Sequence, residues 1–130
     1  MNNVNVKGLL LNVPRYDIIT STADAIIRVL VAVEGTILPV VCCNEVACSA
    51  RELLLEAERN KEVYFSGTLK GNVYTDAVGS KNYLLYMVAD RVAFSEVELK
   101  KLPENNYTPL RYEKLPFNVA DLEDILRYME

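Results

Sequence analysis

The chain has 130 residues, of which 51% are hydrophobic and 25% are charged, and this composition is typical of a single soluble globular domain. The net charge of −4 argues against a protein that binds nucleic acid through overall positive charge. The acidic excess is uneven, however, because residues 1–95 hold nine Lys or Arg and ten Asp or Glu, whereas residues 96–130 hold five and eight. A local basic groove on the first part is therefore compatible with the sequence.

Missing residue types argue against a catalytic or metal site. The chain contains no histidine, which removes catalytic triads, imidazole acid–base chemistry and most transition-metal sites. The phosphate-binding patterns GxxxxGK(S/T) and GxGxxG do not occur either. Cys42, Cys43 and Cys48 form no CxxC pair, and we expect them to be buried, reduced thiols. We therefore expect no enzyme, no metal and no cofactor.

The sequence also lacks signals for a membrane or for secretion. Its longest apolar runs, such as AIIRVLVAV, are far shorter than the roughly 20 residues that a membrane-spanning helix needs. The first residues, MNNVNVKG, contain no basic region followed by an apolar core. We expect a cytoplasmic protein with no membrane partner.

The first half of the chain predicts three strands. Apolar and β-branched residues dominate VNVKGLLLNV (4–13), ADAIIRVLVAV (23–33) and LPVVCCNEV (38–46). Gly8 lies inside the first of these runs, where a glycine often marks a bend, and Pro14 ends it. Residues 14–24 are interpreted as a polar connection.

The second half predicts one helix and two more strands. SARELLLEAERN (49–60) has a helical period, and Ser49 with Glu52 forms a capping box at its start. EVYFSGTL (62–69), in which Gly67 is a second bend candidate, and NYLLYMVADRVAF (82–94) predict strands. Between them, KGNVYTDAVGSKNY (70–83) exceeds the two to five residues of an ordinary hairpin loop, so it is either an overlong turn or a projecting loop that contacts another molecule.

This order of elements predicts an all-β fold. One helix between strands 3 and 4 of five is the pattern of a five-stranded Greek-key barrel of the OB type. A sandwich would normally have about seven strands, and a βαβ fold would alternate helices throughout. We assign residues 1–95 to this domain, 96–117 to an extended connector with three prolines, and 118–130 to a C-terminal amphipathic helix.

Two apolar surfaces predict contacts beyond the barrel core. The second strand is apolar on both faces, with Arg28 as its one interruption, and a barrel has only one inside. We interpret the outer face as a self-association surface of a dimer or tetramer, with cover by the C-terminal segment as the alternative. The terminal helix is expected to dock on its own barrel or a neighbouring subunit, or else on a replication or repair protein.

The strands around the projecting loop resemble the bacterial single-stranded DNA-binding protein family, whose relatives include the primosomal replication proteins. The family pattern has a V-Y-x-x-G-x-L strand, a loop ending near D-x-x-G, and an aromatic residue that opens a strand closing in V-A-D-x-x-x-F. The matching residues are Tyr64, Gly67, Leu69, Gly79, Tyr83, Ala89, Asp90 and Phe94. VNVKGLLLNVP matches the opening strand, so the resemblance covers residues 3–95.

The resemblance implies an oligomeric OB-fold protein that binds single-stranded DNA without sequence specificity in replication, recombination or repair. Bases would stack on aromatic rings while Lys and Arg follow the phosphates. Tyr74 falls at the family's aromatic position in the loop, and Lys70 and Lys81 flank it. The remaining implied binding residues are Arg15 and Tyr16 in the first connection and Lys7 and Arg28 on outward strand positions.

Some positions depart from the family pattern. Ile37 and Cys43 stand where strong binders have aromatic residues, and the projecting loop is poorer in basic residues than in many relatives. We expect Tyr64 and Tyr83, which lie within strands, to pack. The alternative function is therefore an OB-fold protein-interaction module with weak or lost nucleic-acid binding.

Overall fold

The computed structural model describes residues 3–12, 14–57, 61–103, 107–112 and 116–117. Within these residues it contains β1 (Asn3–Leu10), β2 (Arg15–Ile19), β3 (Asp24–Val33), β4 (Thr36–Cys43), α1 (Glu45–Glu56), β5 (Glu62–Thr75), β6 (Lys81–Ala93) and α2 (Glu96–Lys101). The terminal helix expected at 118–130 lies outside the described residues.

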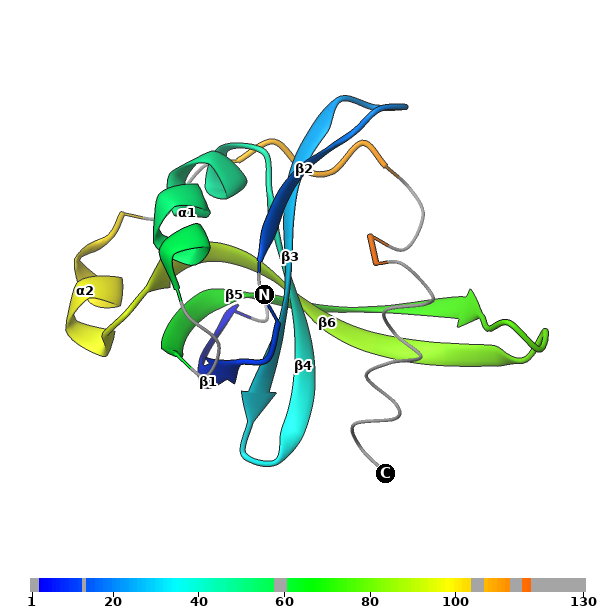
Figure 1. Ribbon diagram of the computed structural model, residues 1–130, viewed down its shortest axis with the longest axis horizontal. Coiled ribbons are helices and arrows are strands. Elements are labelled where there is room, and N and C mark those ends of the chain that lie inside the picture. Colours follow the sequence, from blue (N-terminus) through cyan, green and yellow to red (C-terminus); the bar gives the residue numbers. More distant parts are fainter. Residues whose placement is uncertain (1–2, 13, 58–60, 104–106, 113–115, 118–130) are drawn as a thin grey trace.

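The strands form a ring of hydrogen-bonded neighbours (Figure 1). Their order is β1-β5-β6-β4-β3-β2. A further pairing between β1 and β3 closes the first five strands of this order into a ring, with β2 outside it. The β4–β6 pairing is parallel and the others are antiparallel. The predicted count of five strands was wrong, because β2 lies in the supposed connection and pairs with β3. Consequently, α1 lies between β4 and β5 rather than between strands 3 and 4.

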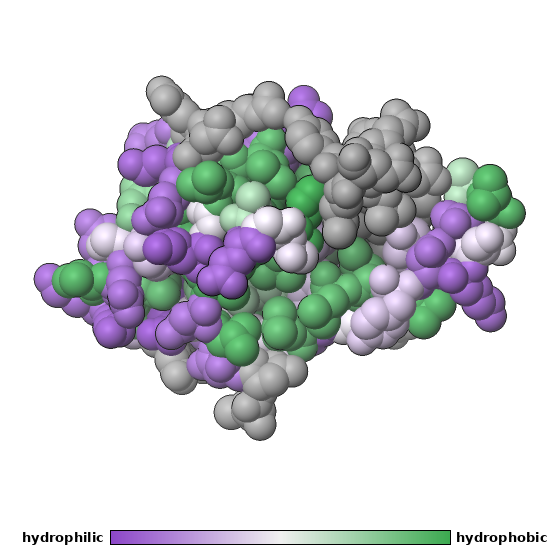
Figure 2. Space-filling view, turned by 90° about the horizontal axis from the view of Figure 1, so that it is seen from below, coloured by the Kyte–Doolittle hydropathy of each residue, from purple (hydrophilic) through white to green (hydrophobic). Residues whose placement is uncertain are grey.

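The projecting loop is largely a two-stranded ribbon, because β5 and β6 continue far beyond the ring. Their pairing runs without a break from Gly67 to Thr75, and only residues 76–80 form the turn. The Asp76 carboxylate stabilises this turn by accepting hydrogen bonds from the Val78 and Ser80 N–H groups at 3.1 and 2.8 Å. We call residues 70–86 the finger. It extends away from the body, and hydrophobic patches alternate along it with polar ones (Figures 1 and 2).

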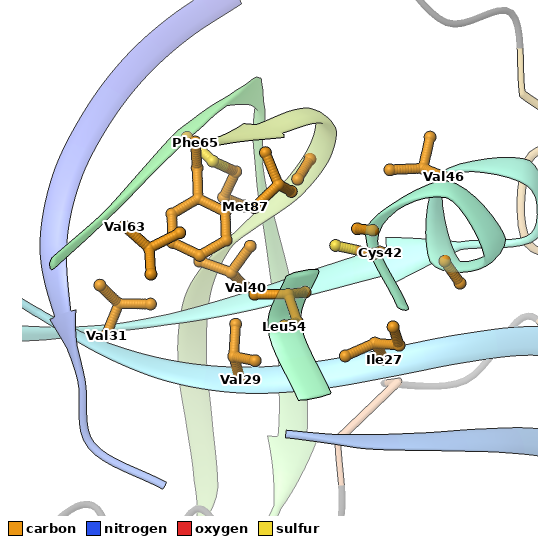
Figure 3. Packing of buried hydrophobic residues seen from close by; sticks show 14 of the residues in the cluster. Ile27, Val29, Val31, Val40, Cys42, Val46, Leu54, Val63, Phe65 and Met87 are labelled. Carbon is orange, nitrogen blue, oxygen red and sulfur yellow. The ribbon is translucent and has the colours of Figure 1, made fainter. Parts of the chain in front are cut away.

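The core fills the inside of the ring (Figure 3). Alternate residues of facing strands meet there, among them Ile27, Val29, Val31, Val40, Cys42, Val63, Phe65 and Met87. The α1 helix adds Val46, Ala47, Ala50 and Leu54 to the same cluster. Gly67 lies at a register shift between β5 and β6, which confirms the predicted bend there.

The α1 helix starts earlier than predicted, and α2 was not predicted. The α1 helix begins at Glu45, not at Ser49, whose hydroxyl instead donates to the Glu45 carbonyl at 2.9 Å inside the helix. Its N-cap residue, Asn44, uses its side chain elsewhere, accepting from the Ala25 N–H at 3.0 Å. The predicted extended connector opens with α2, where the Ser95 hydroxyl accepts from the Glu98 N–H at 3.1 Å.

Candidate nucleic-acid interface

A second apolar cluster covers the side of the sheet that faces away from the core. Successive side chains of a strand point to opposite faces, so one set of residues in β3, β4 and β6 fills the core and the other set points outward. The outward set is Ile26, Val41, Cys43, Tyr86 and Val88, with Leu30, Ile37 and Leu84 packed beside it. We call this surface the outer face. Arg28 lies on it, two residues from both Ile26 and Leu30.

The outer face continues onto one side of the finger. Lys70 lies opposite Tyr86 in the β5–β6 register, and Asn72 and Tyr74 follow at intervals of two on the same side. The Asn72 amide donates to the Tyr86 hydroxyl at 3.5 Å, and Tyr74 is half-buried against the outer cluster. The structure therefore brings Arg28, Lys70 and Tyr74 to one surface.

Arg15 borders this surface, whereas three other predicted residues lie away from it. Arg15 is exposed and pairs with Arg28 across β2 and β3. Tyr16 points to the other side of β2, where the Arg51 guanidinium lies 4.3 Å from its ring centre and Cys48 Sγ lies 3.8 Å from its hydroxyl. The sequence interpretation missed this because it took these residues for a loop, in which neighbours need not face opposite ways.

Lys7 and Lys81 both lie on other surfaces than Tyr74. Lys7 pairs with Tyr64 on β1 and β5 and lines a hollow against α2. Lys81 pairs with Thr75, and the alternation of side chains puts it on the opposite side of the finger from Tyr74. Tyr83 shares that opposite side, where the end of its side chain packs against Gly71, but the residue is 70% exposed.

A segment from the C-terminal part of the chain lies across the outer face. We call residues 107–112 and 116–117 the strap. Phe117 is 7% exposed and meets the Tyr86 ring edge-on, with 5.4 Å between ring centres. Arg28 Nε donates to the Pro116 carbonyl at 2.6 Å, so this guanidinium is already engaged. The alternative that the C-terminal segment covers the outer face is thus confirmed for the described residues.

The strap is anchored near the start of α1 as well. Thr108 donates from its N–H and its hydroxyl to the two Glu45 carboxylate oxygens, both at 2.6 Å. The Asn44 amide donates to the Thr108 carbonyl at 2.8 Å. At the base of the finger, Lys70 and Tyr86 line a hollow of about 240 Å³ beside the strap.

Asp24 is the most deeply placed anchor of the strap. Its side chain is only 2% exposed, yet it accepts hydrogen bonds from the Arg111 and Tyr112 N–H groups, each at 3.0 Å at the closest. Burial by itself raises the pKa of this carboxyl group. The hydrogen bonds from the Thr22 hydroxyl, the Asn44 amide and the two strap N–H groups outweigh burial, so the Asp24 pKa lies below its ordinary value.

Because its folded-state pKa is lowered, Asp24 should hold the strap fully above the ordinary carboxyl pKa and lose this effect as pH falls through the lowered value. We expect Asp24→Asn to speed hydrogen exchange of the Arg111 and Tyr112 amides at neutral pH, since hydrogen bonds to a charged group are worth about 1.5–3 kcal/mol. Hydrogen exchange followed by mass spectrometry measures this. Equal protection in the variant would show that the carboxylate does not hold the strap.

Only two of the three cysteines are buried. Cys42 and Cys43 are buried as predicted, but Cys48 is exposed on α1. In the described ranges, no group of three His, Cys, Asp or Glu side chains is placed to hold a metal ion. No helix there is long and apolar enough to cross a membrane.

Comparisons with known proteins identify the fold. No family model matches the sequence, and no curated protein matches it. The structure is similar to the SSB domain of a protein from Synechococcus sp. with a TM-score of 0.54 and 20% identity, over 71% of this chain and 93% of that one. It is also similar to the second single-stranded DNA-binding protein, SSBb, from Mycobacterium smegmatis, with a TM-score of 0.59 and 16% identity, over 88% and 98%. The predicted likeness to SSB proteins is therefore confirmed at the level of an OB-like fold.

Proposed function

We propose that this protein binds single-stranded DNA without sequence specificity, using the outer face and the finger of a Greek-key OB barrel. The observation that carries the proposal is the meeting of Arg28, Lys70 and Tyr74 on one surface of an SSB-like fold. OB folds bind single strands by stacking bases on aromatic rings and by pairing phosphates with basic side chains. This is a binding role and not a catalytic one.

The cellular setting is part of the same proposal. We propose a cytoplasmic homo-oligomer, dimeric or tetrameric, that acts in DNA replication, recombination or repair. The outer face of β3 is covered by the strap, so assembly would use another surface of the barrel. Light scattering of the purified protein measures the number of subunits.

A titration with oligo-dT at low and at high salt tests the binding proposal directly. Eight tyrosines and no tryptophan make tyrosine fluorescence the natural signal. We expect quenching at low salt and weaker binding at high salt, because phosphate contacts release counterions from the strand. Lack of binding at low salt would rule the proposal out.

Replacing Lys70 with alanine should reduce the salt dependence of binding. Lys70 is exposed beside the hollow at the base of the finger. For a single strand, each lost phosphate contact lowers the slope of log affinity against log salt by about 0.7. Lys100→Ala is the matched control, because Lys100 lies on α2, paired with Glu96 at 3.2 Å. Equal slopes for the two variants would show that Lys70 does not contact a phosphate of the bound strand.

The second candidate function is a protein-interaction module on the same fold. It is favoured by the strap, which occupies the outer face and engages Arg28. On this reading, oligo-dT binding is weak at low salt, and residues 118–130 recruit a replication or repair protein. Deleting 118–130 should then abolish capture of that partner, and unchanged capture would exclude residues 118–130 as its binding site.

A further inference from the structure

We propose that Tyr83 forms a second stacking platform for a nucleobase, on the side of the finger opposite Tyr74. This inference rests on the proposed function and extends the path of the single strand around the finger. We call the surface the reverse face. Its residues alternate along the two strands: Gly71, Val73 and Thr75 of β5, and Lys81, Tyr83 and Leu85 of β6.

The reverse face is open and apolar. Tyr83 is 70% exposed, Val73 63% and Leu85 48%. These residues are cross-strand neighbours, since Val73 pairs with Tyr83 and Gly71 with Leu85. An exposed ring with aliphatic neighbours can accept a planar base on its free side.

Gly71 sets the position of the Tyr83 ring. A Cβ atom added at Gly71 would overlap the hydroxyl and Cζ atoms of Tyr83. The end of the Tyr83 side chain therefore lies directly over the Gly71 backbone, in the space that any other residue would fill. The side chain is thus held against the strand although the residue is 70% exposed, so the platform loses little conformational entropy when a base stacks on it.

The charges around the reverse face favour a single strand of nucleic acid as the occupant. Lys81 supplies a positive charge on this face, next but one to Tyr83. Asp76 is the one acidic residue of the finger sequence. Its carboxylate is engaged within the turn, where it accepts hydrogen bonds from Val78, Ser80 and Asn82. A phosphate beside the stacked base thus meets Lys81 without an opposing carboxylate.

The strap leaves this platform uncovered, in contrast to the outer face. Tyr74 is half-buried in the cluster that also holds Phe117, whereas Tyr83 belongs to neither apolar cluster of the described residues. A strand that passes over the end of the finger would reach both rings. With the strap in place, Tyr83 is the more accessible of the two, and it provides the first base contact.

The test measures binding of dye-labelled oligo-dT to the full chain by fluorescence anisotropy at low salt. We expect Tyr83→Ala to raise the Kd about 5- to 150-fold, the range for loss of one stacked base, and Tyr83→Phe to keep the affinity of the parent. Gly71→Ala should weaken binding while keeping every ring, because its Cβ displaces the Tyr83 side chain. In the Tyr83→Ala background, Gly71→Ala should have no further effect.

Tyr64→Ala is the matched control, since Tyr64 lies on β5 outside the finger, and its Kd should equal that of the parent. An unchanged Kd for Tyr83→Ala, with the parent still binding oligo-dT, would overturn this inference and leave the proposed function intact. If Tyr83→Ala instead lowers the mass seen by light scattering, the reverse face joins a second copy of the chain, and the inference is also wrong. Absence of binding by the parent would overturn the proposed function and the inference together.

Discussion

Replacing Phe117 with alanine should raise the affinity for oligo-dT by about 10- to 150-fold. The side chain is 7% exposed and packs against Tyr86 on the outer face. Burying a phenylalanine side chain stabilises by about 1.5–3 kcal/mol, so its loss shifts the strap toward release by that amount. When the binding-competent state is a minor one, the apparent Kd falls in proportion to its gain in population.

This result depends on competition between the strap and the DNA for one surface. Arg28 donates to the Pro116 carbonyl, and a phosphate oxygen would need the same guanidinium. Phe117→Leu is the matched control, because it keeps an apolar side chain of similar size and should change the affinity little. Faster amide exchange in the strap of Phe117→Ala, with an unchanged Kd, would mean that DNA does not use the outer face.

Gly67→Ala should destabilise the fold by about 3 kcal/mol or more, at the upper end of the range for overpacking. An added Cβ would overlap the Val88 carbonyl oxygen and come within 2.8 Å of the Ala89 Cα atom. Both atoms belong to the backbone of the paired strand β6, which cannot move without breaking the pairing at the register shift. Urea unfolding followed by circular dichroism gives the free energy of unfolding.

Gly71→Ala provides the comparison for this prediction. It inserts the same methyl group into the same strand, but there the added Cβ meets the end of the flexible Tyr83 side chain. We expect its free energy of unfolding to stay within about 1 kcal/mol of the parent, as for a surface substitution. If both variants lose equal stability, backbone crowding at Gly67 is not the cause.

Strands with a strong local sequence pattern were predicted well, whereas elements without such a pattern were predicted poorly. The β-branched run of β3 and the paired strands around the finger have strong local patterns, and both are found where predicted. β2 is short and largely exposed, so no apolar alternation marks it. The start of α1 was misplaced because Ser49 and Glu52 satisfy the rule for a cap, while Asn44 begins the helix without a side-chain cap.

Only part of the candidate site could be predicted from the sequence. Tyr74 and Lys70 were predicted from the family resemblance of the projecting loop, and the strand register puts them on one side. The contacts of the strap join residues about ninety positions apart, such as Arg28 with Pro116. Local sequence patterns cannot predict contacts over such a separation. The position of the Tyr83 ring depends on Gly71, twelve residues earlier and across the ribbon.

The way in which Asp24 holds the strap leaves the side chains at positions 111 and 112 free to vary in evolution. Both hydrogen bonds come from backbone N–H groups, those of Arg111 and Tyr112, and every residue except proline carries such a donor. Positions 111 and 112 can therefore exchange side chains while the anchor persists, and only proline is barred from them. The side chains that the strap exposes to solvent can therefore vary in evolution. The backbone hydrogen bonds to Asp24, which hold the strap over the outer face, are kept.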